Sequence, residues 1–280
     1  MTISSSKFRN NPYTRPFGSN RYIPCGTVID SLNSYDIVFL QDYKSTFAQN
    51  MPPTSYGIWE DSPQILDFLV SCMSIAWPNS YFGLAHFSDY PIAPYGVPDE
   101  DFVYQEIVPL TPANEISPLQ WSSYAYSAAQ HDGNWSVNGG DLKNCALDAI
   151  DSAINSTTIG WRNLPVGNLD RQYIKIVVIL TDQLPHDSGL EQGVPHTSSA
   201  VVGNNMITNS IRPIYILIND DYASSFTRYT FTSTEGIGQT FRTSDLYEIS
   251  PAFTLTPNRI TERIITNMYK KIYLDGSWIP

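Results

Sequence analysis

The sequence predicts a single α/β domain with a doubly wound, mostly parallel sheet flanked by helices on both faces. The chain has 280 residues, 42% of them hydrophobic, which is enough to build a substantial core. Three apolar runs, "YDIVFLQD", "IKIVVIL" and "RPIYILIND", have the length of strands that are covered on both faces. Helical patterns alternate with these runs. Such alternation indicates parallel strands joined by right-handed crossovers.

The chain divides into an arm and one domain. Residues 1–30 are rich in Ser, Asn, Arg and Pro without periodicity, so we expect an irregular arm. Residues 31–280 show no internal repeat and no change of composition, which favours one domain. The first strand is expected at 35–42. Residues 62–77 follow as a helix, because apolar residues recur at helical spacing after an opening Ser-Pro pair.

The remaining elements continue the alternation of strands and helices. "YFGLAHFSDY" is predicted to be a strand, and "FVYQEIVPL" a strand or half of a hairpin. Helices are expected in "SPLQWSSYAYSAAQ", after the Gly-Gly pair of "NGGDLKNCALDAIDSAINS", in "SSAVVGNNMITNSI" and in "TPNRITERIITNMYKKIY". A polar connection, "YTFTSTEGIGQTFRTS", precedes the last helix.

The charge balance restricts the kind of partner. Acids outnumber bases 27 to 16, for a net charge of −11, so we expect no nucleic acid and no anionic membrane surface as partner. The longest apolar run, "IKIVVIL", is too short to span a bilayer, and the chain starts without an apolar signal core. We therefore expect no direct membrane insertion. A cationic ligand, a metal ion or a protein with a basic patch remains compatible with this charge.

The three cysteines show no metal-binding or disulfide pattern. Cys25, Cys72 and Cys145 form no CxxC pair, so we expect neither a zinc site nor a disulfide framework. Cys72 and Cys145 fall in apolar helical patterns and are predicted to be buried free thiols. Low Lys content with many Tyr, Asn, Ser, Thr and Pro residues favours an extracellular or particle surface.

Two of the predicted strands end on an aspartate. "IVFLQD" ends at Asp42 and "IVVILTD" at Asp182. In an open parallel sheet the binding crevice lies at the carboxyl ends of the strands, where the strand order reverses. If the two strands are neighbours there, both carboxylates face one crevice and a cation between them would relieve their repulsion. The alternative is that each aspartate caps the helix after its strand.

Asp42-Tyr43-Lys44-Ser45-Thr46 resembles the D-x-S-x-S loop of von Willebrand factor A domains. "DAIDSAINSTTIGWRN" followed by "IKIVVILTDQLPH" is similar to the A-like domain of integrin β subunits. The similarity spans about residues 36–269 and is most specific over 139–186. It implies a von Willebrand A-type, Rossmann-like fold. It also implies binding of a ligand carboxylate through a divalent cation at the metal-ion-dependent adhesion site.

Carried over position by position, the resemblance implies a degenerate site. Asp42 and Asp182 match the two metal-site aspartates, and Thr46 matches the second metal-binding serine. Lys44 stands where the first serine is expected, and an ammonium group has no lone pair to offer a metal. Asn138 stands where integrin β domains place an acid. These departures remove negative charge and add a positive one.

Three interpretations of Lys44 remain open. Its ammonium group takes the place of the cation between Asp42 and Asp182; or a weakened metal site persists while the lysine reaches solvent; or the lysine is solvated and no metal binds. We expect no cofactor in the first and third cases. Mg²⁺ or Ca²⁺ would be held by Asp42, Thr46 and Asp182 in the second.

Two aromatic loops are candidate binding surfaces. "DYPIAPYGVPDEDF" carries Tyr90, Tyr95 and Phe102, and "QWSSYAYSAAQHDGNW" carries Trp121 and Trp135. Rigid aromatic side chains lose little conformational entropy on binding. Core packing accounts for some of these rings, and the others are expected to form an aromatic rim beside the Asp42 crevice.

The sequence thus predicts a protein-binding or adhesion module and not an enzyme. No serine elbow, second catalytic histidine or oxyanion signature accompanies His186 and Asp187, for which a loop hydrogen bond is expected instead. The alternative is a structural subunit of an extracellular or particle assembly that uses the A-type fold as a docking scaffold. The expected partners are a protein ligand or neighbouring subunits.

Overall fold

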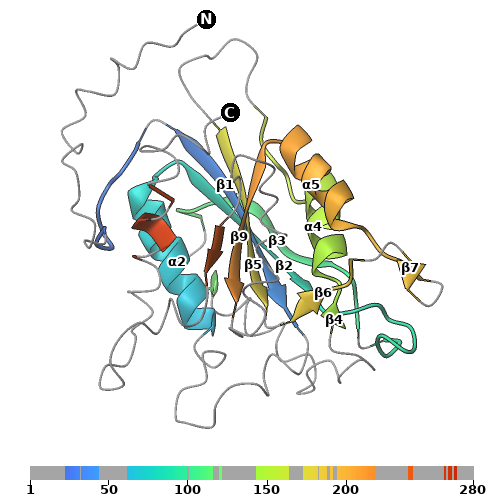
Figure 1. The fold of residues 1–280 in the computed structure, drawn as a ribbon. Helices are drawn as coiled ribbons and strands as arrows, with labels where there is room; N and C mark the ends of the chain where they lie inside the picture. Colours follow the sequence, from blue (N-terminus) through green and yellow to red (C-terminus); the bar gives the residue numbers. More distant parts are fainter. Residues whose placement is uncertain are drawn as a thin grey trace, which may run out of the picture.

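The computed structural model contains one six-stranded mixed sheet, and it confirms the predicted doubly wound α/β class (Figure 1). It describes residues 23–31, 33–43, 62–99, 101–115, 120–121, 143–163, 173–181, 183–187, 190–191, 194–217, 239–241, 262, 264–266 and 268–269. The strand order is β10-β9-β5-β1-β2-β3. Only β3 runs antiparallel to its neighbour. The strands are β1 (Ser34–Asp42), β2 (Ser80–Phe87), β3 (Gln105–Pro112), β5 (Tyr173–Thr181), β9 (Ile211–Leu217) and β10 (Gln239–Phe241).

Helices cover both faces of the sheet (Figure 1). The helix α2 (Ser62–Ala76) lies on one face, and α4 (Ala146–Asn155) and α5 (Ser199–Thr208) lie on the other. Residues of the predicted closing helix that the structure describes, such as 264–266, are helical and pack on the α2 side. Two short pairings complete the described structure: β4 (Lys143–Asn144) with β6 (Leu184–Pro185), and β7 (Leu190–Glu191) with β8 (Val194–Pro195).

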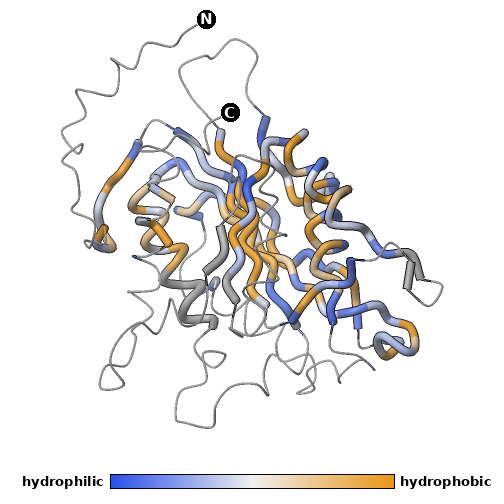
Figure 2. The backbone as a smooth tube through the Cα atoms, viewed as in Figure 1, coloured by the Kyte–Doolittle hydropathy of each residue, from blue (hydrophilic) through white to orange (hydrophobic). Residues whose placement is uncertain are grey.

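The core has two layers, and alternate residues of the central strands face each of them. In β1, Ile37 and Phe39 belong to the layer under α2, whereas Val38 and Leu40 face α4. The side chains of a strand point to opposite faces in turn, so a strand that is covered on both sides must be apolar throughout. Figure 2 shows the resulting hydrophobic colour along the middle of the sheet. The continuous apolar runs in the sequence have this origin.

The strand order reverses between β1 and β5. The chain goes from β1 through α2 to β2 on one side, and from β5 through α5 to β9 on the other. The pairing of β1 with β5 is parallel and runs from Ser34↔Tyr173 to Gln41↔Leu180. This confirms that the strands ending at Asp42 and Thr181 are neighbours. Their crossovers diverge at the carboxyl edge of the sheet, where doubly wound folds place their sites.

A disulfide between Cys25 and Cys72 corrects one sequence prediction. We expected Cys72 to be a free thiol, but 47 residues separate the two cysteines and no spacing rule reveals such a pair. The bond attaches the segment before β1 to α2. The backbone N–H groups of Ile29 and Asp30 also donate to the carbonyl oxygen of Ala76. Cys145 is a buried thiol outside the disulfide, as predicted.

At the opposite, amino edge of the sheet, Arg162 fastens the loop after α4 to β1. Its backbone N–H and its Nε donate to the two oxygens of the Asp36 carboxylate at 2.8 and 2.6 Å. The guanidinium group also lies over the Tyr81 ring, 3.5 Å from its centroid. Asp36 is fully buried, so this pairing keeps a buried charge compensated.

The polar connection before the last helix differs from the prediction in one respect. It contains the short strand β10, which pairs in parallel with β9 at the edge of the sheet. A strand this short leaves too little periodicity to be seen in the sequence. None of the helices in the described part of the chain has both the length and the apolar content needed to cross a membrane.

Candidate functional site at the carboxyl edge of the sheet

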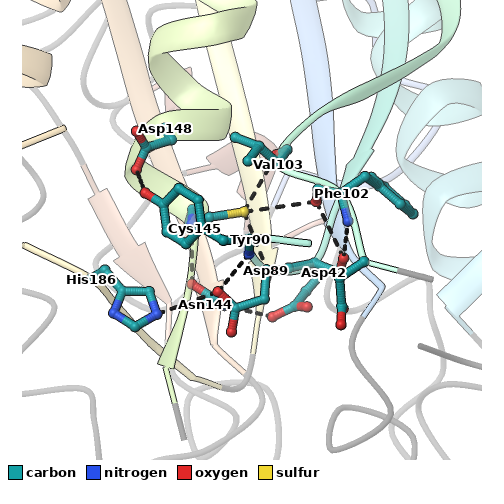
Figure 3. Close-up of polar contacts among 12 residues, drawn as sticks. Asp42, Asp89, Tyr90, Phe102, Val103, Asn144, Cys145, Asp148 and His186 are labelled. Carbon is teal, nitrogen blue, oxygen red and sulfur yellow. Dashed lines mark hydrogen bonds and ion pairs between the residues drawn. The ribbon is translucent and has the colours of Figure 1, made fainter. Parts of the chain in front are cut away.

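Asp42 lies at the end of β1, at the point where the strand order reverses, and its side chain is fully buried. Its Oδ2 accepts hydrogen bonds from Asn144 Nδ2 and from the Thr181 hydroxyl, both at 2.7 Å. Thr181 is the last residue of β5, and Asn144 belongs to β4, directly before α4. We call Asp42, Asn144 and Thr181 the edge network (Figure 3 shows the bond between Asp42 and Asn144).

The orientation of the Asn144 amide is fixed by its neighbours. Its Oδ1 accepts from the backbone N–H of Ala146 at 3.1 Å, at the start of α4. Its Nδ2 therefore faces the Asp42 carboxylate and the Thr181 hydroxyl oxygen, 2.8 Å away. The Thr181 oxygen also accepts from the backbone N–H of Gln183 at 3.2 Å. Each group of the edge network thus donates or accepts according to its chemistry.

At the described part of this edge, Asp42 Oδ2 faces hydrogen-bond donors, while Lys44, Thr46 and Asp182 lie outside the described residues. Mg²⁺ and Ca²⁺ require several oxygen ligands directed at one point. Here Asn144 directs its nitrogen at Asp42, and the Thr181 proton points at the same carboxylate oxygen. Within the described ranges, no group of three or more His, Cys, Asp or Glu side chains is arranged to hold a metal ion.

Several predicted site residues lie outside the described residues. These are Lys44, Thr46, Asn138, Asp182 and Trp135. Of the residues predicted for the metal site, the structure therefore describes Asp42 alone, which lies at the end of β1. Asn144 was missed by the sequence analysis. It lies one position before Cys145, the N-cap of α4, so the N-cap preference gave no direct signal for it.

The β2–β3 loop, residues 88–104, projects from this edge and is anchored at its base. Asp101 is buried, and its Oδ2 accepts from the backbone N–H of Val97 at 2.7 Å. The backbone N–H groups of Tyr95 and Gly96 both donate to Ile92 O at 3.0 Å. A Cβ added to Gly96 would lie 2.3 Å from the Tyr90 carbonyl oxygen and 2.5 Å from Asp101 Oδ2. The loop backbone is therefore packed against itself.

Four rings join this loop to the chain around His186 and His196. We call Tyr90, Tyr95, His186 and His196 the ring cluster. All six of its ring pairs are in contact, with centroids 4.7 to 5.8 Å apart. The two imidazoles are stacked, with centroids 4.7 Å apart and ring planes at 9°. His186 Nε2 lies 3.3 Å from Asp89 Oδ1, a contact that Figure 3 shows.

Asp148 of α4 connects the ring cluster to the helix layer. Its Oδ2 accepts from the Tyr90 hydroxyl, and its Oδ1 accepts from the backbone N–H and hydroxyl of Thr197 at 3.1 and 2.7 Å (Figure 3 shows the bond to Tyr90). Burial, together with the neighbouring Asp148 carboxylate, raises the pKa of the Tyr90 phenol above its ordinary value. Tyr90 is thus a donor with a fixed proton.

Of the five aromatic residues named for the two predicted binding loops, three are buried, and Trp135 lies outside the described residues. Tyr90 and Tyr95 are buried in the ring cluster, and Trp121 is fully buried in the core, where it meets Phe39 edge-on. Their rings are needed to cover the base of the loop and the sheet. Phe102 is half-buried against the Tyr43 ring.

The exposed part of the loop is aliphatic instead of aromatic. Pro91, Ile92, Ala93 and Pro94 are all exposed, and Ile92 leaves 43% of its surface in solvent. We call these four residues the loop tip. In Figure 2 the loop projects at the lower right and includes a hydrophobic stretch. Of the described acids in this loop, Asp89 and Asp101 are buried and Asp99 is exposed.

Comparisons with known proteins find similar solved structures but no match in sequence. No protein-family model matches the sequence, and no curated protein matches it. Among solved structures, the chain is similar to proximal thread matrix protein 1 from the mussel byssus. The TM-score is 0.47 and the sequence identity 16%, and the alignment covers 85% of this chain and 47% of that one. The chain spans about half the length of the mussel protein.

Proposed function

We propose that this chain is a non-enzymatic protein-binding module whose binding surface is the carboxyl edge of the sheet. The observation that carries the proposal is the loop tip, an exposed aliphatic surface on a loop whose backbone is already ordered. An ordered loop loses little conformational entropy when it binds, so more of the contact energy contributes to affinity. The net charge of −11 favours a partner with an apolar cleft bordered by basic residues.

The same proposal includes a degenerate adhesion site that works without a cation. The support is the edge network, in which hydrogen-bond donors face the Asp42 carboxylate. Lys44 is proposed to supply the positive charge that a cation would supply in the family. An oxidising compartment agrees with the Cys25–Cys72 disulfide, since such bonds persist outside the cytosol. We therefore propose an extracellular or particle-surface location.

Calorimetric titration with Mg²⁺, Mn²⁺ and Ca²⁺ tests the cation-free site. We expect no binding to the wild-type chain and a gain of binding in Lys44→Ser, which replaces the ammonium group with a hydroxyl ligand. Micromolar binding to the wild type that disappears in Asp42→Ala would show that the metal site is retained. Lack of binding to Lys44→Ser would show that the lysine is not what excludes the metal.

One observation favours the alternative of a structural subunit. The helix α5 contains no charged residue, and it leaves Val201 and Ile207 49% and 47% exposed. An uncharged, partly apolar helix face suits docking against another subunit. Val201→Asp and Ile92→Asp therefore form a matched pair, since each places one charge on an exposed aliphatic position of a different surface.

A photo-crosslinking amino acid at position 92, and separately at 201, identifies contacts in cells that produce the protein. The captured protein is then purified, and its affinity is measured for both aspartate variants. The loop proposal expects a loss of at least about tenfold for Ile92→Asp and less than about twofold for Val201→Asp. The reverse pattern would support the docking scaffold, and equal affinities would refute both surfaces.

A further inference from the structure

We propose that the stacked His186–His196 pair is a proton-operated latch that holds the β2–β3 loop closed at neutral pH and releases it at acidic pH. Only the link to binding rests on the proposed function, because the latch would control how the loop tip is presented. The opening itself is a property of the isolated chain. It is therefore measured without any partner.

The ring cluster connects segments that are far apart in the sequence. Tyr90 and Tyr95 belong to the β2–β3 loop, His186 follows β6, and His196 lies just before α5. Both tyrosine rings contact both imidazoles, so the two histidines form the surface on which the loop packs. The backbone of His186 is held in place, because its N–H donates to Asn144 O at 2.9 Å. A change in the histidine pair therefore acts directly on the loop.

The geometry makes protonation of His186 more favourable than protonation of His196. His186 Nε2 lies 3.3 Å from the buried Asp89 carboxylate, which stabilises a positive charge on this ring. His196 is stacked on His186 at 4.7 Å and is only 6% exposed. A proton on His196 would therefore place two like charges face to face with little water between them. Separation of the rings relieves this repulsion and hydrates both imidazolium groups.

Other titratable groups lie around the two histidines and Tyr90. They are Tyr95 of the loop, Cys145 and Asp148 at the start of α4, and Asp89 beside the end of β2. Both Asp148 oxygens accept hydrogen bonds, from the Tyr90 hydroxyl and from Thr197. Those bonds hold the closed arrangement. Histidine is thus the residue type in the ring cluster whose ordinary pKa lies in the operating range.

Opening of the latch would change the structure of the loop in a defined way. The Tyr90 and Tyr95 rings would leave the imidazoles, and the loop tip would lose the support that keeps it ordered. A partner that binds the ordered tip at neutral pH would then be released on acidification. The transition is reversible, because no covalent bond changes.

Amide hydrogen exchange measured by mass spectrometry at pH 7.5 and 5.0 tests the latch on the purified chain. Protection factors, corrected for intrinsic exchange, are compared for residues 90–97 and 196–199. We expect protection there to fall at least about tenfold at pH 5.0 in the wild type. In His196→Phe, which keeps a planar ring without a titrating group, we expect the fall to disappear.

His86→Phe is the matched control, because His86 is another fully buried histidine but lies on β2, outside the ring cluster. This variant should retain the loop response. An unchanged wild-type loop at pH 5.0, or the same response in His196→Phe, would overturn the proposal. If His196→Phe does not fold, the imidazole C2-proton resonances of the wild type provide a second test. Rings that titrate without loop opening at the same midpoint would also overturn it.

Discussion

Replacement of His86 by phenylalanine should remove a large part of the acid sensitivity of this fold. His86 lies on β2 opposite Gln41 of β1, is fully buried, and stacks on the Tyr43 ring with centroids 5.6 Å apart. Neither ring nitrogen has a hydrogen-bond partner among the described residues. Burial lowers the pKa of His86 from 6.5 to about 3, so the native state holds this imidazole neutral.

The sign and size of the effect follow from proton linkage. Below pH 6.5 the unfolded chain binds a proton at this histidine that the native state does not bind, so native stability falls as the pH falls from 6.5 towards about 3. Each pH unit in this window costs about 1.4 kcal/mol. Between pH 6.5 and pH 5.0 the loss amounts to about 2 kcal/mol. Phenylalanine retains the planar ring beside Tyr43 and cannot bind a proton.

Urea denaturation of wild type and His86→Phe at pH 7.5 and pH 5.0 measures this contribution. The difference in unfolding free energy between variant and wild type should increase by about 2 kcal/mol in favour of the variant at pH 5.0, with unchanged m-values. Comparing the two proteins cancels groups that titrate in both. A difference that is the same at both pH values would show that His86 is charged or hydrated in the native state, and the reasoning from burial would fail.

Three further perturbations test other parts of the structure. Gly96→Ala should loosen the β2–β3 loop or cost about 2 kcal/mol, because its Cβ would meet the Tyr90 carbonyl oxygen at 2.3 Å; loop exchange rates equal to wild type would contradict this. Reduction of the Cys25–Cys72 bond should lower the unfolding free energy by about 3 to 4 kcal/mol, with no effect of reductant on a Cys25→Ser variant as the control. Arg162→Ala should lower the unfolding free energy by about 3 kcal/mol, because it leaves the buried Asp36 carboxylate uncompensated. The control is the double variant Asp36→Asn/Arg162→Met, which removes both charges and should lose less stability in thermal unfolding.

The strands of the central sheet were predictable because burial on both faces requires an apolar composition. β1 and β5 are covered on both faces, so their central positions, 37–40 and 176–180, are apolar and the runs are visible without any contact information. The position of Asp42 followed from the same argument, since parallel strands end at one edge. Whether β1 and β5 are neighbours was left open by the sequence, and the structure shows that they pair in parallel.

Features that depend on contacts distant in the sequence were not predictable in this way. Composition shows that Tyr90 and Tyr95 belong to a loop, but whether their rings face solvent depends on His186 and His196, about 100 residues later. The disulfide had the same difficulty, because the separation of its cysteines follows no motif. Asn144 was missed for the same reason, because its bond to Asp42 spans 102 positions.

The Cys25–Cys72 bond also determines how the molecule would bear mechanical load. It joins the segment before β1 to α2, whose last residue, Ala76, accepts hydrogen bonds from Ile29 and Asp30. The end of α2 lies at the amino edge of the sheet, because β2 begins directly after it. Tension applied at Ile23 therefore enters the fold covalently at that edge and passes into α2. The bond closes the chain between Cys25 and Cys72 into a covalent loop, so tension at Ile23 cannot extend that stretch, which includes β1, while the disulfide is intact.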